Sequence, residues 1–378
     1  MLANLLLMAM MAITPTDQTV QVAKGTKLDV NNFAGDVNIK VWDKDAVRVE
    51  VNNSDRETVD IKQGEQTVTV RSRSLRGGRP RSLDYTISVP SWMAITVAGT
   101  YADVTMEGVG ADVSVETTHG DVRVRGGSGF VSLKSVQGEI TLERAKGRVE
   151  VRAVNESIHL ADINGDLSAE STNGSIILDR IDSGNVDLYT VNGNISYDGA
   201  IRDKGLYRLT THNGLIAMPI ADKANALLTV RTYNGGFRST FAIGDPEKRN
   251  KRFTVTLGNG SAHVELESFG GTISLRRPND PRPETERKRR EKEKEKEKDN
   301  QLGLALGSGG FQPEIDRAVA EAIREVGPEI ERAMADAQPE IDAAIAEAMA
   351  ELHSVMPFAI PTPHPTPRPN PQPNPRIR

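Results

Sequence analysis

Apolar and polar residues alternate in short blocks that recur every nine residues through the middle of the chain. Within residues 120–151, glycines stand at positions 120, 129, 138 and 147, and each is followed two and four residues later by an aliphatic residue. Alternate residues of a β-strand share one face, so the aliphatic residues point one way and the polar residues between them, such as Asp121 and Arg123, point the other. The pattern predicts short, half-buried strands that are joined by corners.

The nine-residue unit repeats without a slip from residue 102 to residue 178, and the later units fall into pairs. These pairs begin at residues 165 and 174, 184 and 193, 205 and 214, 226 and 235, and 251 and 260. The step within a pair stays at nine residues, whereas the step between pairs grows from 10 to 16 residues. Two strands therefore form one coil of about 18 residues, with one fixed corner and an opposite corner that accepts insertions.

A five-residue strand cannot bury its apolar face alone, and stacked coils are the usual solution for repeats of fixed period. We therefore predict an all-β fold, a single-stranded β-solenoid with regular coils over residues 99–277. The strand in GGTISLRRP is expected to end the stack at residues 276–278. Residues 17–98 alternate well but without a clean period of nine, and we assign them to the N-terminal coils and a cap, which protects an open sheet edge.

The fixed corner carries a recurring asparagine, directly before the first position of the second strand of each coil. Asparagine and glycine both tolerate the positive φ of a tight corner. Stacked coils would place these amides about 4.8 Å apart, so that they could hydrogen-bond along the axis of the stack. We predict a structural ladder of Asn155, Asn173, Asn192, Asn213, Asn234 and Asn259.

Composition narrows the range of functions. The chain has 378 residues, a net charge of −5 and no cysteine, which excludes disulfides and thiol chemistry and does not indicate a general nucleic-acid binder. An apolar run from Leu5 to Ile13 is too short for a membrane span, which needs about 20 residues, but fits the core of a secretory signal. We therefore interpret residues 1–16 as a signal peptide and expect an extracytoplasmic protein, in the periplasm or at the cell surface.

Three stretches resemble the bacterial "putative-adhesin" family of β-strand-repeat proteins. They are NFAGDVNIKVWDKDAVRVEV, ISVPSWMAITVAGTYADVTMEGVGADVSVETTHGDVRV and the repeated TxNGxI phrase in STNGSIIL, TVNGNISY and THNGLIAM. The resemblance covers roughly residues 20–276. It implies an export-associated domain of unknown function, a right-handed single-stranded β-solenoid in the envelope or outside the cell, and no catalytic residues to transfer.

The last hundred residues are of a different kind. Residues 278–310 are a charged and glycine-rich linker with too few apolar residues for a core. Residues 311–354 repeat the phrase PEIDRAVAEAI and predict amphipathic helices with an acidic face, which favours self-association or a protein partner over anionic lipid. In residues 355–378 proline occupies every second position from 361 to 375, which predicts a polyproline II spacer, a tether or a disordered tail.

Few residues point to chemistry. Asp103, Asp121 and Glu139 occupy equivalent outward positions and could share a calcium ion, although a solvated charged face explains them equally well. Aromatic residues at inward positions of the longer coils (Tyr197, Tyr207, Tyr233 and Phe237) are interpreted as core. The insertion corner supplies candidate recognition loops, with Asp198, Arg202, Asp203, Lys204, Asp222, Lys223, Asp245, Lys248 and Arg249.

The leading hypothesis is a non-enzymatic cell-envelope or surface solenoid that acts as an adhesion or structural scaffold, with no cofactor and with a tail for assembly or tethering. Its partner would be a protein or a glycan, not nucleic acid, and membrane contact would be limited to tethering. Three alternatives stay open at this point. They are an envelope-stress accessory that binds a regulator through the acidic helices, a polysaccharide-binding or polysaccharide-active β-helix, and an intracellular solenoid that polymerises end to end.

Overall fold

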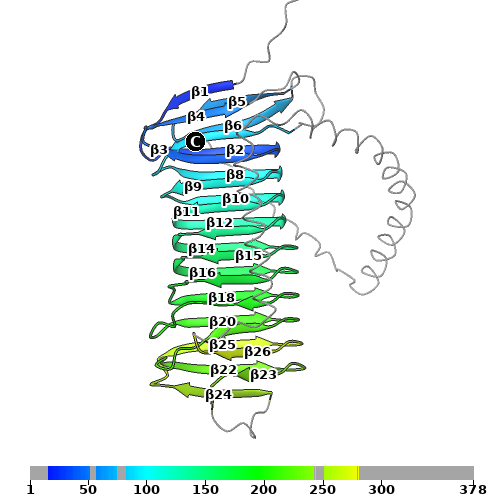
Figure 1. The fold of residues 1–378 in the computed structure, drawn as a ribbon. Coiled ribbons are helices and arrows are strands. Elements are labelled where there is room, and N and C mark those ends of the chain that lie inside the picture. The colour runs from blue at the N-terminus through cyan, green and yellow to red at the C-terminus, as the bar shows by residue number, and fades with distance from the viewer. Residues whose placement is uncertain are drawn as a thin grey trace, which may run out of the picture. The chain divides into compact units, whose positions relative to one another are not determined.

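The computed structural model describes residues 16–51, 57–74, 82–241 and 251–278, together with residues 243 and 280. All regular secondary structure in this part of the chain is β-strand, arranged in two sheets of 13 strands each (Figure 1). The two sheets form the walls of one stack, and the chain alternates between them along most of its length. This confirms the predicted all-β solenoid, whereas its right-handed sense stays a prediction.

The two sheets are named A and B, and their strands are given in spatial order. Sheet A contains β1 (Thr16–Gln21), β4 (Ala46–Val51), β7 (Tyr85–Pro90), β3 (Val37–Trp42), β9 (Val104–Val109), β11 (Val122–Gly126), β13 (Ile140–Glu143), β15 (Ile158–Ala161), β17 (Ile176–Asp179), β19 (Ile195–Ser196), β21 (Ile216–Pro219), β26 (Ile273–Arg276) and β23 (Phe237–Ser239). Sheet B contains β24 (Arg252–Leu257), β22 (Ala226–Thr232), β25 (Ala262–Ser268), β20 (Leu206–Thr211), β18 (Asn185–Thr190), β16 (Asn164–Ser171), β14 (Lys146–Ala153), β12 (Ser128–Gln137), β10 (Val113–His119), β8 (Ala94–Tyr101), β2 (Lys27–Ala34), β6 (Thr67–Ser74) and β5 (Glu57–Gln63).

The nine-residue pattern sets the strand faces in the regular part. Val122 and Val124 are buried, with at most 2% of their surface exposed, while Arg123 between them is exposed. Val122 pairs in parallel with Ile140, which lies 18 residues further along the chain. The inward residues of both sheets merge into one hydrophobic core along the stack, and each fully buried aliphatic side chain contributes about 1.5–3 kcal/mol.

The C-terminal end of the stack departs from the prediction. Strand β25 pairs with β20 on one side and with β22 on the other, and β26 likewise lies between β21 and β23 (Figure 1). The last coil of the chain is therefore inserted between the two coils that precede it. The predicted coil at 251 and 260 is wrong because residues 252–257 instead form β24, which runs antiparallel to β22. The strand in GGTISLRRP, β26, is consequently not the last strand of its sheet.

The N-terminal end is arranged in the same way. The first coil, β2 and β3, lies between the coil of β6 and β7 and the coil of β8 and β9. Antiparallel strands then cover the outermost coil, because β5 pairs with β6 and β4 pairs with β7. The first coil and the last coil of the chain thus each lie one coil inside an end of the stack, with a coil on both sides, while β1 pairs with β4 at the edge of sheet A. Such pairing limits fraying and covers open sheet edges.

The described strands belong to one compact unit, Met1–Pro281. Apart from Thr16, Pro278 and Asp280, the predicted signal peptide, linker, acidic helices and polyproline segment lie outside the described residues. Within the described ranges, we find no helix with the length and apolar character needed to cross a bilayer.

Candidate functional site

The fixed corner carries the predicted asparagine ladder over four consecutive coils. Each side-chain amide donates to the amide oxygen of the coil before it, from Asn173 to Asn155 over 3.0 Å, from Asn192 to Asn173 over 3.1 Å and from Asn213 to Asn192 over 3.0 Å. The side chains are exposed, so the ladder ties successive corners together at the surface.

The two remaining members of the predicted ladder lie elsewhere. Asn234 occupies the corner of the outermost coil, but the inserted coil places Gly270, which has no side chain, between it and Asn213. Asn259 lies in the turn between β24 and β25, where its side chain accepts the backbone N–H of Ser261 over 3.0 Å. The ladder therefore ends at Asn213, and Asn259 is a turn residue.

Replacing Asn192 by alanine removes two ladder bonds at once and is expected to lower the free energy of unfolding by about 1 kcal/mol. The midpoint of thermal unfolding should fall by about 2–4 °C, measured by circular dichroism. Asn185→Ala is the matched control, because Asn185 is exposed on β18 and its bonds to Ser183 use backbone atoms. Equal midpoints for the two variants would contradict a stabilising ladder.

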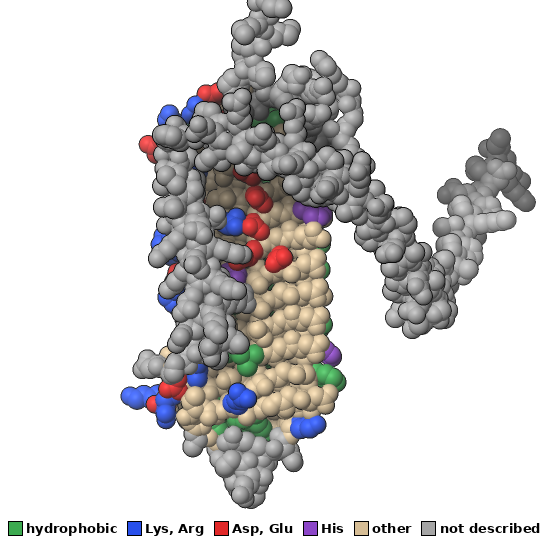
Figure 2. All heavy atoms as spheres, turned by 45° about the vertical axis from the view of Figure 1, so that its right-hand side comes forward, with side chains coloured by type: hydrophobic (Ala, Val, Ile, Leu, Met, Phe, Trp, Pro, Cys, Tyr) green, Lys and Arg blue, Asp and Glu red, His purple; other side chains and the backbone are tan. Residues whose placement is uncertain are grey.

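A column of carboxylates runs beside the fixed corner, where five neighbouring sheet A strands begin. Its members, in spatial order, are Asp84, Asp36, Asp103, Asp121 and Glu139. Acidic side chains gather in the upper part of the face that Figure 2 shows. The structure thus brings the three predicted calcium ligands into one line with two further aspartates that the sequence reasoning missed.

The three predicted calcium ligands already use side-chain oxygens in contacts within the chain. Asp103 accepts the backbone N–H of Asp121 over 2.8 Å, and Asp121 accepts that of Glu139 over 2.8 Å. The second oxygen of Asp121 pairs with Arg123 at 2.6 Å, and Glu139 lies 3.2 Å from the Nε2 atom of His159. Among the described residues, no group of three or more histidine, aspartate or glutamate side chains is arranged to hold a metal ion. We therefore assign no calcium site to this column.

The column does affect stability through charge. Partial desolvation of its carboxyl group, together with the neighbouring carboxylates of Asp84 and Asp103, raises the pKa of Asp36 above its ordinary value. A raised pKa in the folded state means that stability is lost as the pH rises through it. Asp36→Asn should therefore unfold at a higher temperature than the wild type at pH 7 and low salt, with a modest gain because Asp36 is exposed. The gain should vanish below about pH 3, where Asp36 is protonated in both states; a gain that persists there would contradict this origin.

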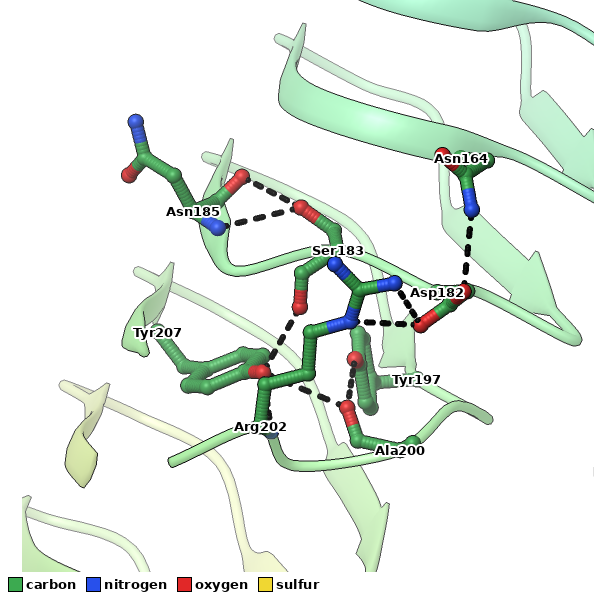
Figure 3. Close-up of polar contacts among 8 residues, drawn as sticks. All are labelled: Asn164, Asp182, Ser183, Asn185, Tyr197, Ala200, Arg202 and Tyr207. Carbon is green, nitrogen blue, oxygen red and sulfur yellow. Dashed lines mark hydrogen bonds and ion pairs between the residues drawn. The ribbon is translucent and has the colours of Figure 1, made fainter. Parts of the chain in front are cut away.

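The insertion corner is held by a polar network around two buried tyrosines (Figure 3). The hydroxyl of Tyr207 donates to the carbonyl of Ser183 over 2.7 Å and accepts the backbone N–H of Arg202 over 2.7 Å. Tyr197 donates to the carbonyl of Ala200 over 3.2 Å. Tyr197 and Tyr207 are thus core residues, as predicted, and burial raises the pKa of both hydroxyls. Their hydroxyls hold the lengthened loop against the stack.

The charged residues of the predicted recognition loops mostly bind the chain itself. The Nε atom of Arg202 lies 2.6 Å from Asp182, which also accepts the amide of Asn164 over 2.9 Å (Figure 3). Asp203 accepts the hydroxyl of Ser261 over 2.7 Å. Asp222 pairs with Arg277 at 2.8 Å, and Asp198 lies 3.9 Å from Arg276. Lys204 and Lys223 are exposed, and Asp245, Lys248 and Arg249 lie outside the described residues. The described charged side chains of these loops therefore connect neighbouring coils.

A different surface combines exposed aromatic and charged side chains. It lies on the outer face of sheet B, where β20, β25 and β22 are neighbours and each contributes three successive outward residues. We call these nine residues the array. Each row holds two residues of a strand and the residue that directly follows it. The rows are Arg208, Thr210 and His212 for β20; Glu265, Glu267 and Phe269 for β25; and Thr229, Arg231 and Tyr233 for β22. The inserted coil supplies the middle row.

The third column of the array is a stack of aromatic rings. The ring centroids of His212 and Phe269 are 4.6 Å apart and nearly parallel, and those of Phe269 and Tyr233 are 5.2 Å apart. Phe269 is 41% exposed and Tyr233 is 46% exposed, so the prediction that Tyr233 is a core residue is wrong. The lower part of the stack in Figure 2 carries hydrophobic side chains and a histidine at its right-hand edge. The three rings belong to residues that directly follow the strands. They therefore lie at the fixed corner, at the surface of the stack.

The other two columns surround a polar hollow of about 270 Å³, lined by Arg208, Thr210, Thr229, Arg231, Glu265, Leu266 and Glu267. Arg231 lies 3.3 Å from Glu267 and 3.9 Å from Glu265, and Arg208 lies 3.4 Å from Glu265. The Nε atom of Arg231 is buried and has no hydrogen-bond partner in the described part of the chain. The Tyr233 hydroxyl reaches Glu267 over 3.4 Å and so joins the rings to the hollow. Sequence reasoning missed this site because two of its rows become neighbours only through the inserted coil.

Comparison with known proteins identifies the family. The solved structures that match the chain include a "putative adhesin" from Parabacteroides distasonis, which is 10% identical over 69% of this chain and 97% of that chain, with a TM-score of 0.35. A "putative adhesin" from Bacteroides fragilis is 13% identical over 69% of this chain and 97% of that chain, with a TM-score of 0.29. A "putative lipid binding protein" from Parabacteroides distasonis is 11% identical over 69% of this chain and 96% of that chain, with a TM-score of 0.25. None of the curated proteins matches the chain. A family model described as Toastrack DUF4097 matches residues 25–276, which is more than half of the sequence. The chain therefore belongs to the Toastrack DUF4097 family, in agreement with the resemblance drawn from its repeats.

Proposed function

We propose that the protein is an extracytoplasmic, non-enzymatic scaffold that binds a ligand through the array and serves adhesion or envelope structure. The observation that carries this proposal is the exposed ring stack beside a charged hollow, on three strands that are fixed by pairing on both sides. Exposed apolar surface with a polar rim is typical of interaction sites. Side chains on paired strands hold their geometry better than side chains on loops, which favours recognition.

The rest of the described surface supports binding over chemistry. The carboxylates of the array lie beside arginines, and in the acidic column Asp84, Asp103 and Asp121 accept backbone N–H groups. Carboxylates with such partners are not available as a general base or a nucleophile. Those roles need a group with a shifted pKa that a substrate can reach. A scaffold that displays a recognition face remains the simplest use of such a stack.

Two measurements test this function. A C-terminally tagged full-length protein should fractionate with the envelope or the medium, and a cytosolic location would overturn the proposal. The purified protein should also attach to intact cells or isolated envelopes. Replacing both Phe269 and Tyr233 by serine should weaken attachment at least tenfold, whereas Phe130→Ser should not. Phe130 is the matched control because it is 40% exposed on the same sheet, on β12, far from the array.

Residues 279–378 are proposed to mediate assembly or tethering, on the basis of their acidic amphipathic repeats and alternating prolines. Deleting residues 284–378 keeps Asp280, which bonds to Thr240 and to the backbone of Arg277. The shortened protein should still fold but should change in oligomeric state or in cell fraction. An unchanged state in both respects would show that the tail has no such role.

A further inference from the structure

We infer that the array binds a neutral glycan chain, an inference that rests on the proposed ligand-binding role of this face. The first argument is charge. Two guanidinium groups, of Arg208 and Arg231, face two carboxylates, of Glu265 and Glu267, so the array has no net charge. The arginines would attract an anionic polymer, but the glutamates lie only 3.3–3.9 Å from those arginines and would repel it. A basic partner would be attracted by the glutamates and repelled by the arginines. Charge complementarity therefore favours an uncharged ligand.

The second argument is unused hydrogen-bonding capacity. The contacts between arginine and glutamate in the array, at 3.3–3.9 Å, are longer than the 2.7–2.9 Å of strong charged hydrogen bonds. The buried Nε atom of Arg231 has no partner among the described residues. Guanidinium donors, carboxylate acceptors and threonine hydroxyls therefore alternate over a few ångströms. A polyhydroxylated ligand is the class that offers both donors and acceptors at this spacing, and it satisfies each kind of group without adding charge.

The third argument is the apolar border. A sugar ring has an apolar C–H face and a rim of hydroxyls, so it needs an aromatic surface directly beside polar groups. In the array Tyr233 provides this junction, since its ring packs on Phe269 while its hydroxyl reaches Glu267. Tyr189 adds a further exposed ring beside the array, because it is 42% exposed and pairs with Thr210, at the end of the middle column.

The dimensions fit a chain better than a single sugar. Two steps between strands span about 10 Å, and four residues along a strand span about 13 Å. The array is open at the surface along both directions, and this area accommodates two or three consecutive rings. We therefore expect affinity to rise with chain length up to about that number of sugars.

The experiment uses the full-length protein and a panel of soluble neutral polysaccharides, namely a glucan, a mannan and a galactan, with alginate as the acidic comparison. Affinity electrophoresis identifies a binder, and titration calorimetry with its oligosaccharides measures the affinity. At least one neutral polysaccharide should bind, with little dependence on salt between 50 and 500 mM. Phe269→Ala with Tyr233→Ala should weaken binding at least tenfold, and Phe130→Ala should bind as the wild type does. Circular dichroism checks that each variant is folded.

Three outcomes would overturn the inference. They are no binding to any neutral polysaccharide, binding that the double variant leaves unchanged, and preferential, salt-sensitive binding of alginate. Should the glycan panel fail while the Phe269 and Tyr233 variant still loses attachment to cells, the binding role of the array stands and its ligand is of another class, such as a protein. Glu267→Gln provides a second variant that keeps the shape of the array. It should weaken glycan binding by removing a charged acceptor, and it should lower the unfolding midpoint by no more than about 4 °C, because the exposed pair with Arg231 adds little stability.

Discussion

Replacing Gly271 at the fixed corner by alanine is expected to cause a large loss of stability. A β-carbon at this position would overlap the carbonyl oxygen of Gly214 in the neighbouring coil. That oxygen is held in place, because it also accepts the hydroxyl of Ser268 over 3.2 Å, and the backbone of Thr272 bonds to Ile216 over 3.0 Å. The clash can be relieved only by separating two paired coils. We expect a loss of about 3 kcal/mol or more, which lowers the unfolding midpoint by roughly 6–12 °C.

Gly184→Ala provides the control for this prediction. Gly184 lies at the opposite corner, where a β-carbon would meet no heavy atom within 4 Å and where φ is not in the left-handed region. Alanine there should be neutral or slightly stabilising, because it reduces the freedom of the unfolded chain. Circular dichroism melts of the two variants side by side decide the matter. Equal midpoints would mean that the coils at Gly214 and Gly271 are not in contact as described.

The second large effect is expected at Tyr207. Tyr207→Phe keeps the ring in the core but leaves the carbonyl of Ser183 and the backbone N–H of Arg202 without their bonds of 2.7 Å each. Leaving buried polar groups unpaired costs about 1–3 kcal/mol, or roughly 2–12 °C in the midpoint. Tyr189→Phe is the control, since Tyr189 is 42% exposed and its hydroxyl has access to water. A loss at Tyr189 equal to that at Tyr207 would contradict the role of the buried hydroxyl.

The same variant makes a prediction about alkaline pH. Burial raises the pKa of the Tyr207 hydroxyl above 10, its ordinary value, so the folded protein retains a proton that the unfolded chain releases. The Tyr207 hydroxyl therefore makes its full contribution to the free energy of unfolding below about pH 10, and this contribution is lost as the pH rises further. Because phenylalanine cannot ionise, the difference in midpoint between the wild type and Tyr207→Phe should narrow above pH 10. A difference that stays constant up to pH 12 would contradict this.

Much of the fold could be predicted from the sequence because the alternation of buried and exposed residues along a strand depends only on near neighbours in the chain. The aliphatic residues two and four places after Gly120 and Gly138 set the strand faces, and the parallel register of 18 residues follows from the paired units. The asparagine ladder from Asn155 to Asn213 was predictable for the same reason, since stacked corners bring equal positions together.

The order of the terminal coils could not be predicted, because the nine-residue units are interchangeable as strand partners. Residues 262 and 271 are nine apart, as are residues 251 and 260, and Asn259-Gly260 imitates the corner phrase of the true coils. In the structure this phrase forms a chain reversal, with φ of 56° at Gly258 and 70° at Gly260. The alternation of apolar residues says which face of a strand is buried, but not which coil lies next to it.

The candidate site could not be predicted for the same reason. Arg208, Glu267 and Arg231 become neighbours only when β25 lies between β20 and β22. The charges are the one signal that bears on this order. The middle row is acidic and the two flanking rows carry arginines, so the inserted order places unlike charges together across the strands. Such exposed pairs are worth about 0.2–1 kcal/mol each, which favours one register without determining the fold.

The central claim is that the last coil is inserted between its two predecessors, since this insertion builds the array. Two engineered cysteine pairs test it in a chain that has no cysteine of its own. Leu206 pairs directly with His263, so their α-carbons lie about 4.8 Å apart, within the range that a disulfide bridges. Leu227 pairs with the other side of His263, so Leu206 and Leu227 are two strands, or about 10 Å, apart.

The measurement is the yield of intramolecular disulfide after mild oxidation of the folded protein, read by mass spectrometry of its peptides. The inserted order predicts nearly complete cross-linking of Leu206→Cys with His263→Cys, and little cross-linking of Leu206→Cys with Leu227→Cys. Coils that followed one another in the order of the chain would give the reverse result. Efficient cross-linking of the second pair and not of the first would contradict the inserted coil, and with it the site.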